Sequence, residues 1–285
     1  MPADPPRTPP LDVKAFGLTD KGRVRSANED QFLVAELTKG MRVWHTSLSG
    51  PHVQFGDERA HLFMVADGMG GQRAGATASS LAMVAIEQFT LNTLKWFFDS
   101  NGPEAQRVLS QFQGALREAD ADIVEQGNDQ PALTGMGTTL TMAYHLREDL
   151  CVVHVGDSRA YLFRAGELHQ LTRDHTLVAE LVRKGALPPG QVAAHRLRHV
   201  ITNVVGGQNV GVEIEAHALH LEPGDCLLLC TDGLSEMLSA EAITAILRAE
   251  PEPEAACAKL VAQANAAGGR DNISVVMVRF AAAVS

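Results

Sequence analysis

Cysteine is scarce in this chain, and the spacing of the few cysteines excludes the usual cysteine-based sites. The 285 residues include four, Cys151, Cys226, Cys230 and Cys257, and no two form the C-x-x-C spacing typical of zinc or redox sites. No arginine stands six residues after any of them, so the Cys-x5-Arg loop of a phosphocysteine enzyme is missing. A disulfide framework is not expected, and the apolar run around Cys226 and Cys230 predicts buried free thiols.

Long apolar runs and basic runs are also missing. No stretch approaches the roughly 18 apolar residues of a membrane span, and the N-terminal residues have no apolar core for a signal peptide. The 24 Lys and Arg residues are scattered among 34 Asp and Glu residues, for a formal net charge of −10. General attraction to nucleic acid or to anionic membranes is therefore not expected, whereas cation binding is favoured. We expect a cytoplasmic protein.

The length and composition fit a folded enzyme. Aromatic residues are few, at 5%, but 45% of the chain is hydrophobic, which is enough for a substantial core in one large domain or two small ones. Five of the first ten residues are proline. Proline cannot donate to a sheet, so we expect an extended tail over residues 1–12 and a folded part over 13–285.

Apolar patterning predicts strands and helices in an order that does not suit regular βαβ winding. Strands are predicted at residues 13–18, 31–36, 61–66, 138–145, 150–156, 160–164, 212–219, 225–231 and 273–280. Helices are predicted at 73–99, 103–126, 240–248 and 254–266. Short polar turns join the three strands between 138 and 164, which favours an antiparallel meander. Residues 174–200 change character and predict a flap outside the sheets, and 38–59 predict a hairpin with a loop.

Aspartates recur where these predicted strands meet glycine-rich or asparagine-rich turns. The four clusters are Asn28-Glu-Asp30, Asp67-Gly-Met-Gly-Gly71, Asp232-Gly233 and Gly268-Gly-Arg-Asp-Asn272. Any single Asp-Gly pair is typical of an ordinary turn. Several buried strands that each end in a carboxylate need another reason, and hard cations such as Mg²⁺ and Mn²⁺ prefer carboxylate, carbonyl and water oxygens. Gly68 is the best candidate for a carbonyl ligand, because glycine lets the backbone approach closely.

In motif order, the chain resembles the PPM family of metal-dependent, type 2C protein phosphatases, of the bacterial type, over roughly residues 15–280. The matching segments are Gly22-Arg-Val-Arg-Ser-Ala-Asn-Glu-Asp30, Val65-Ala-Asp-Gly-Met-Gly-Gly71, Gly137-Thr-Thr-Leu140, Val155-Gly-Asp-Ser-Arg-Ala-Tyr161, Thr231-Asp-Gly-Leu234 and Arg270-Asp-Asn272. The resemblance implies an α+β fold, a four-layer αββα sandwich in which helix pairs enclose two antiparallel sheets. It also implies hydrolysis of phosphoserine and phosphothreonine with two Mn²⁺ or Mg²⁺ ions and, in some members, a third.

The resemblance also assigns roles to individual residues. Asp67 would bridge both metals with help from the Gly68 carbonyl, and Glu29 and Asp30 would belong to the shell of one ion. Asp232 and Asp271 would hold the other ion, and Asp157 with Asp232 would hold a weaker third. Arg25 would grip the substrate phosphate with its bidentate guanidinium. Two cations that share a water can lower its pKa and present a hydroxide to phosphorus, so no protein nucleophile is required.

Two positions depart from the family pattern. Met69 stands where many eukaryotic members have a histidine proposed as the general acid, so we expect water to protonate the leaving group. His175 and His199 are the nearest histidine candidates, but neither is assigned this role. Glu236 stands where an aspartate is frequent, and its longer side chain could alter affinity for a third metal.

The expected partners are phosphoproteins, a serine/threonine kinase or its targets, and the chain is expected to be a monomer in signal transduction. A catalytically silent regulatory module and a hydrolase of small phosphate esters are the alternatives.

Overall fold

A computed structural model describes residues 11–39, 58–92, 104–192, 194–208 and 211–283. The first strand begins at Leu11, two residues before the predicted start of the folded part, and residues 1–10 lie outside the described residues. The tip of the predicted 38–59 hairpin, with Trp44, lies outside them as well. The two strands that flank this tip pair with each other in antiparallel register, as the hairpin prediction requires.

The first sheet has five strands in the order β1, β12, β11, β7, β8, and the pairs recorded within it are antiparallel. Its strands are β1 (Leu11–Asp20), β7 (Arg159–Arg164), β8 (Glu167–Gln170), β11 (Cys226–Cys230) and β12 (Ile273–Ala282). The first and last strands of the fold therefore lie side by side.

The second sheet has seven strands in the order β10, β6, β5, β3, β4, β9, with β2 paired to β3. Its strands are β2 (Asp30–Lys39), β3 (Glu58–Met69), β4 (Gly137–Thr138), β5 (Leu140–Leu146), β6 (Asp149–Val155), β9 (Val205–Gly206) and β10 (Glu215–His220). Its recorded strand pairs are also antiparallel.

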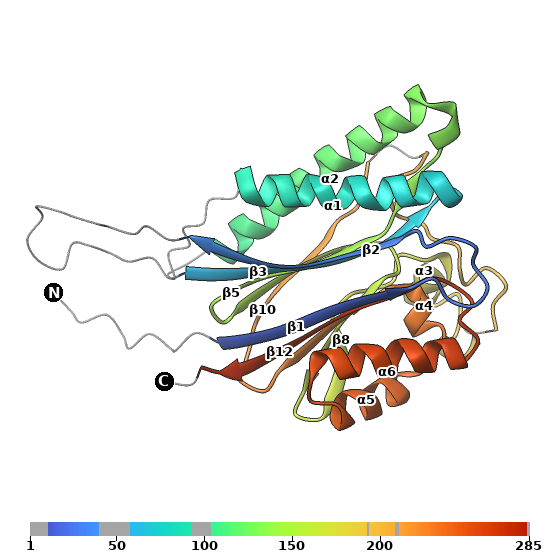
Figure 1. The fold of residues 1–285 in the computed structure, drawn as a ribbon. Helices are drawn as coiled ribbons and strands as arrows, with labels where there is room; N and C mark the ends of the chain where they lie inside the picture. Colours follow the sequence, from blue (N-terminus) through green and yellow to red (C-terminus); the bar gives the residue numbers. More distant parts are fainter. Residues whose placement is uncertain (1–10, 40–57, 93–103, 193, 209–210, 284–285) are drawn as a thin grey trace, which may run out of the picture.

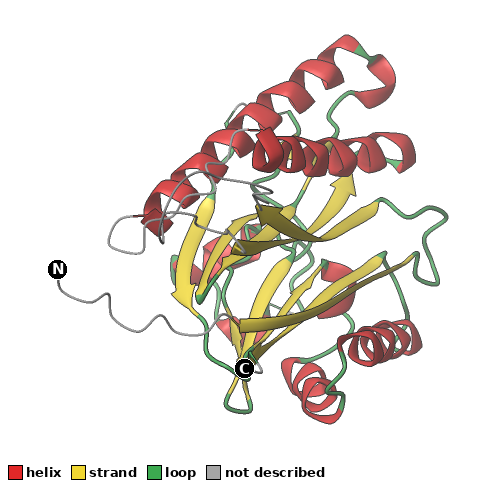
Figure 2. Cartoon of the chain, turned by 60° about the vertical axis from the view of Figure 1, so that its left-hand side comes forward, coloured by secondary structure: helices red, strands yellow, loops and turns green. Residues whose placement is uncertain are grey.

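Helices cover the outer face of each sheet, which confirms the four-layer αββα sandwich (Figure 1; Figure 2 shows the two sheets face to face). Helices α1 (Gln72–Asn92) and α2 (Glu104–Asp129) lie on the second sheet. Helix α5 (Ala240–Ala249) and helix α6 (Pro253–Ala266) lie on the first. The shorter helices are α3 (Leu177–Arg183) and α4 (Asp232–Ser235), with 3-10 turns η1 (Pro131–Leu133) and η2 (Pro189–Gln191).

Three apolar cores separate the four layers, and strand β3 shows why. Side chains alternate across a strand. Phe63 and Val65 of β3 pack into the core between the sheets, whereas Leu62 and Met64 pack into the core under α1 and α2. Because both faces of the strand are buried here, its sequence is apolar without interruption from Leu62 to Ala66.

The predicted meander of three strands is wrong at its last step. Strand β6 pairs with β5 and β10 in the second sheet, whereas β7 pairs with β8 and β11 in the first. The chain crosses between the sheets at Gly156, whose φ is +109°. A Cβ atom on Gly156 would stand 2.5 Å from Thr139 Cγ2, so this crossing requires glycine. It leaves Asp157 between the ends of the two sheets.

The cysteines behave as the sequence predicts. All four are free and buried. Cys226 and Cys230 face the core under α5 and α6. Burial raises the pKa of each thiol to about 12, so none is a ready nucleophile. Among the described helices, none has the length and apolar character needed to cross a membrane.

Candidate metal and phosphate site

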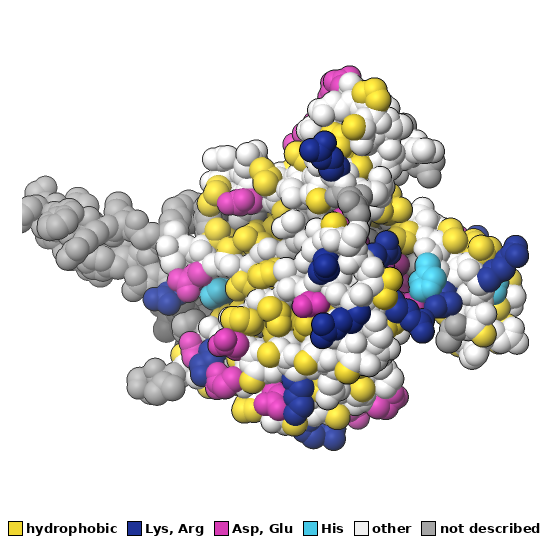
Figure 3. Space-filling model, turned by 45° about the vertical axis from the view of Figure 1, so that its right-hand side comes forward, with side chains coloured by type: hydrophobic (Ala, Val, Ile, Leu, Met, Phe, Trp, Pro, Cys, Tyr) yellow, Lys and Arg dark blue, Asp and Glu magenta, His cyan; other side chains and the backbone are white. Residues whose placement is uncertain are grey.

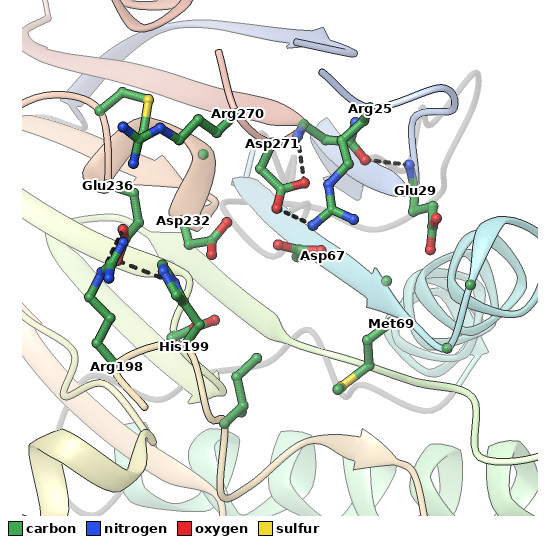
Figure 4. Close-up of a pocket in the computed structure, with 18 residues that line it drawn as sticks. Arg25, Glu29, Asp67, Met69, Arg198, His199, Asp232, Glu236, Arg270 and Asp271 are labelled. Carbon is green, nitrogen blue, oxygen red and sulfur yellow. Dashed lines mark hydrogen bonds and ion pairs between the residues drawn. The ribbon is translucent and has the colours of Figure 1, made fainter. Parts of the chain in front are cut away.

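A cavity of about 540 Å³ opens where the strand ends of the two sheets meet. Its lining brings together six acidic side chains from segments far apart in the sequence, Glu29, Asp67, Asp157, Asp232, Glu236 and Asp271 (Figure 4). The cavity is also lined by Gly68 and Arg25. The structure thus gathers every predicted site residue except Asp30 in one lining.

Asp30 lies immediately behind this cavity. It is the first residue of β2 and stands opposite Asp67 in the β2–β3 ladder. Only 3% of Asp30 is exposed. Its Oδ2 accepts hydrogen bonds from Thr231 Oγ1 and Ser274 Oγ, both at 2.8 Å. These two hydroxyls fix the carboxylate, although sequence reasoning had given them no role.

The backbone around Asp67 is held by two threonines that follow α2. The Asp67 N–H donates to Thr139 Oγ1 at 3.0 Å, and the Asp67 carbonyl accepts from Thr138 Oγ1 at 2.9 Å. The motif Gly137-Thr-Thr-Leu140 therefore supports the aspartate directly. The match of this segment to a family motif is the only feature of the sequence that points to this supporting role.

Gly68 is required for close packing and not for an unusual backbone angle. A Cβ atom on Gly68 would stand 2.1 Å from the carbonyl oxygen of Gly75, in the first turns of α1. Gly75 in turn faces Glu29, whose Oε2 would stand 2.0 Å from an added Cβ. In the same motif, Gly70 and Gly71 have positive φ angles, of +120° and +90°. Two glycines thus let β3, α1 and the loop that carries Glu29 meet around one point.

The aspartates raise one another's pKa. Burial, followed by repulsion from neighbouring aspartates, raises the pKa of Asp67 well above its usual value. The same causes raise the pKa of Asp157 to about 8 and that of Asp232 to about 6. Burial raises the pKa of Asp30 to about 7 despite its two hydroxyl donors. A cluster of this kind is costly to ionise without positive charge nearby.

One cation of the protein already neutralises part of the cluster. Arg25 Nη2 lies 2.5 Å from Asp271 Oδ2, and this hydrogen bond raises the pKa of Arg25. The loop that carries Arg25 is anchored by Asn272, whose side chain donates to the carbonyls of Lys21 and Ala27, each at 2.9 Å. The Glu29 N–H donates to Asn272 Oδ1 at 2.8 Å. Asn272 therefore sets the position of Arg25 and Glu29 relative to Asp271.

The donor set fits a hard divalent cation. Asp30, Asp157 and Asp232 each have a buried Oδ1 without a hydrogen-bond partner among the described residues. Buried oxygens of this kind are normally paired or coordinate a cation. In the described part of the chain, no three acidic, His or Cys side chains already stand together as a ligand group. Asp271 is turned toward Arg25, so this carboxylate would have to exchange partners in order to bind a cation.

The two candidate histidines differ in position. His199 lines the cavity, and its Nδ1 lies 3.7 Å from Glu236 Oε1. His175 is instead part of the scaffold. The Gly156 N–H donates to His175 Nδ1 at 3.1 Å, and His175 Nε2 lies 3.5 Å from Glu215. His175 therefore supports the turn that carries Asp157.

Met69 lies at the mouth of the cavity with 39% of its surface exposed. It ends strand β3, two residues after Asp67. Its thioether has no proton to donate. Arg198, Met237 and Arg270 also line the cavity, although sequence reasoning had not placed them there.

Comparisons with known proteins agree with this geometry. The family model described as protein phosphatase 2C matches residues 51–263. The chain is 30% identical to the serine/threonine phosphatase stp of Listeria innocua, over 91% of this chain and 93% of that protein. It is 37% identical to protein phosphatase PhpP of Streptococcus pneumoniae, over 76% of this chain and 85% of that protein.

Solved structures give the same result. The serine/threonine phosphatase of S. agalactiae matches with a TM-score of 0.79 and 32% identity, covering 94% of this chain and 99% of that chain. The catalytic domain of serine threonine protein phosphatase PstP, in complex with two manganese ions, matches with a TM-score of 0.74 and 31% identity, covering 95% of this chain and 99% of that chain. The fold and the site thus define a protein phosphatase of the αββα class. The chain belongs to the protein phosphatase 2C family.

Proposed function

We propose that this phosphatase removes phosphate from phosphoserine and phosphothreonine residues of proteins, with two Mn²⁺ or Mg²⁺ ions held by the strand-end carboxylates. The observation that carries the proposal is the set of buried, mutually repelling aspartates, three of which have an unpaired oxygen at the site. Such a set is stable in its ionised form when cations lie among the oxygens. Arg25 alone cannot neutralise it.

The ligand roles follow the family pattern and the positions of the side chains. Asp67, at the centre of Figure 4, would bridge two ions with the Gly68 carbonyl beside it. In Figure 4, Glu29 lies on one side of Asp67 and Asp232 on the other, and Asp30 is paired with Asp67 in the β2–β3 ladder. Asp157 and Asp232 would hold a third ion. When bound, such ions activate water as a nucleophile near neutral pH and neutralise the phosphoryl oxygens.

Arg25 is the group that would bind the substrate phosphate. Its guanidinium already lies over the carboxylates, on Asp271, and its side chain is 56% exposed. If cations neutralise Asp271, the guanidinium becomes available for a phosphoryl group, to which it can donate two parallel hydrogen bonds. Asn272 would keep Arg25 in reach of the reacting phosphorus while its partner changes.

Leaving-group protonation would depend on water at this site. Met69 occupies the mouth of the cavity and cannot act as an acid, and His175 is committed to the turn at Gly156. His199 faces Glu236. The protein's own contribution to this step is therefore to admit and orient water beside the departing oxygen.

The substrates would be phosphoproteins, with a serine/threonine kinase or its targets as partners in signal transduction. The names of the related phosphatases support the substrate class. The particular partner, the monomeric state and the cytoplasmic location stay predictions from the sequence.

The test is an assay of substrate range with Mn²⁺ present. The proposal expects turnover of a phosphothreonine peptide and of p-nitrophenyl phosphate, lost in Asp67→Ala and Asp232→Ala. Arg117→Ala, an exposed residue of α2 that does not line this cavity, is the control for the effect of an arginine substitution elsewhere. Turnover of the small ester without the peptide would point to a small-molecule hydrolase. Binding of phosphopeptide without turnover would point to a silent regulatory module.

A further inference from the structure

The cavity is lined by three arginines and one histidine in addition to its acidic side chains. Arg25 contacts Asp271. Arg198 Nε lies 3.6 Å from Glu236 Oε2, and His199 contacts the same carboxylate. Three of the four basic side chains therefore have a carboxylate partner within the site.

Arg270 is the exception. It lines the cavity and is exposed, yet the structure gives it no hydrogen bond or ion pair with any described residue. In Figure 4, Arg25 and Arg270 lie on opposite sides of Asp271, and the Arg270 guanidinium points away from that carboxylate. Arg270 is thus a charged side chain of the site that has no direct partner among the described residues.

Contacts on both sides of Arg270 hold the backbone of this residue in position. The Arg23 N–H donates to the Gly269 carbonyl at 2.7 Å, and the Gly269 N–H donates to the Ala264 carbonyl at 3.1 Å. Gly269 has a φ of +50°, and an added Cβ would stand 2.5 Å from Asn265 Oδ1. On the other side of Arg270, Asp271 and Asn272 are fixed by the contacts described above. These contacts therefore fix the backbone from which the Arg270 side chain reaches the cavity.

Figure 3 shows how the charged side chains are distributed over one face of the molecule. The formal net charge is −10, yet Lys and Arg side chains gather along the middle of the face shown in Figure 3. On that face, acidic side chains lie mostly toward the lower and left margins. An arginine without a carboxylate partner attracts anions, and substrates with negative charge near the target residue gain most from it.

We propose that Arg270 binds an anionic side chain, a carboxylate or a second phosphate, that lies close in sequence to the phosphoserine or phosphothreonine being hydrolysed. The proposal rests on the proposed function and names its substrate class, phosphoproteins with acidic surroundings at the phosphorylated residue. Arg25 would bind the target phosphate on one side of Asp271, and Arg270 would bind the neighbouring anion on the other. A guanidinium suits both anions, because its planar fork donates two parallel hydrogen bonds to either.

The test compares kcat/KM on four phosphothreonine peptides that differ only in the residues flanking the phosphothreonine. These flanks are alanine, glutamate, lysine or a second phosphorylated residue. For the wild type, glutamate or phosphate flanks should raise kcat/KM about tenfold over alanine flanks, the value of one charge-assisted hydrogen-bonded pair. The preference should shrink at high ionic strength. The peptide with the larger gain identifies whether carboxylate or phosphate is the natural anion.

Three variants assign this preference to Arg270. In Arg270→Ala, the ratio of kcat/KM on the acidic peptides to kcat/KM on the alanine peptide should fall to near one. In Arg270→Glu, the peptide with lysine flanks should have the highest kcat/KM. Arg270→Lys keeps the charge without the fork and should retain part of the ratio. Arg117→Ala, an exposed arginine on α2 outside the cavity, should keep the wild-type ratio. Because each readout is a ratio within one variant, a loss of folded protein does not imitate the effect.

The inference would be overturned if Arg270→Ala kept the wild-type ratio of kcat/KM between acidic and alanine peptides. This includes the case in which the variant lowers kcat/KM by the same factor on every peptide. Equal wild-type kcat/KM on all four peptides would also overturn it and leave the proposed function intact. Wild-type protein that hydrolyses none of the peptides with Mn²⁺ would instead contradict the proposed function.

Discussion

Asp30 lies directly opposite Asp67 across the β2–β3 ladder, at the end of the second sheet. A slip of one residue in this pairing would turn one of the two carboxylates to the other face of the sheet. The register is held by apolar side chains farther along β3, such as Phe63 and Val65 in the core between the sheets. Core packing therefore determines how close the two carboxylates stand.

Thr231→Val should lower stability and weaken Mn²⁺ binding without changing the shape of the site. Thr231 Oγ1 donates to Asp30 Oδ2 and accepts from the Ser274 N–H at 2.9 Å. Loss of this buried hydroxyl should lower the free energy of unfolding by about 1–3 kcal/mol. It should also weaken Mn²⁺ binding, because the pKa of Asp30 rises further. Chemical unfolding and calorimetric Mn²⁺ titration measure the two effects.

Thr244→Val is the matched control for this change. Thr244 is half-buried on α5, where its hydroxyl donates to the Ala240 carbonyl. Its replacement should leave Mn²⁺ affinity unchanged. Equal Mn²⁺ affinity in Thr231→Val and wild type would mean that the hydroxyl does not tune Asp30.

Arg25→Ala should separate substrate binding from metal binding. Loss of the guanidinium should raise KM for a phosphothreonine peptide by roughly tenfold or more, the usual value of a charge-assisted contact. Mn²⁺ should bind at least as tightly as to the wild type, because Asp271 no longer has to leave Arg25. Arg23→Ala removes an exposed arginine two residues away that does not line the cavity. Weaker Mn²⁺ binding in Arg25→Ala alone would show that Arg25 supports the metal site.

Met69→His should supply the missing acid. A protonated imidazole at the mouth of the cavity would help an alkoxide to leave, whereas p-nitrophenolate needs no such help. The ratio of peptide turnover to p-nitrophenyl phosphate turnover should therefore rise, most clearly below about pH 7, where histidine is protonated. Met69→Leu, which adds no proton donor, should keep the wild-type ratio. A ratio that Met69→His leaves unchanged would mean that leaving-group protonation does not limit turnover.

The unfolding free energy should depend on pH through a histidine pair remote from the cavity. His145 Nδ1 lies 3.1 Å from His61 Nδ1, and burial lowers the pKa of His145 from 6.5 to about 4. Between about pH 6.5 and pH 4 the unfolded chain therefore binds a proton that the folded chain does not. Stability must fall as the pH is lowered through this window, by roughly 3 kcal/mol for this one group.

His145→Phe isolates this contribution. The loss of unfolding free energy between pH 6.5 and pH 4 should be smaller in this variant than in the wild type, as measured by chemical unfolding in EDTA. His220→Phe, whose histidine is 66% exposed in the wild type, is the control and should retain the full loss. An unchanged loss in His145→Phe would contradict the buried neutral state.

Sequence predicted most of this fold because its motifs join a buried strand to a polar turn. Leu62 to Ala66 followed by Asp67 defines both a strand and the end of it that faces the site. The apolar pattern of a strand does not indicate to which sheet the strand belongs. The sequence therefore predicts β7 beside β6 and does not predict the crossing between the sheets at Gly156. The contact between Thr231 and Asp30 spans 201 positions and depends on packing of the two sheets. The sequence places Arg270 in a family motif but does not indicate whether its guanidinium has a partner, because that depends on which side chains the fold brings near it.

The central claim is that cations held by Asp67 and its neighbours carry the catalysis. The most direct test is phosphate release from a phosphothreonine peptide by metal-stripped protein titrated with Mn²⁺, for the wild type and Asp67→Asn side by side. The account predicts no release before Mn²⁺ is added, saturating release by the wild type, and at least a hundredfold less by Asp67→Asn, on the order of a lost transition-state charge contact. Release that survives removal of the metal, or that is equal in the two proteins, would contradict it.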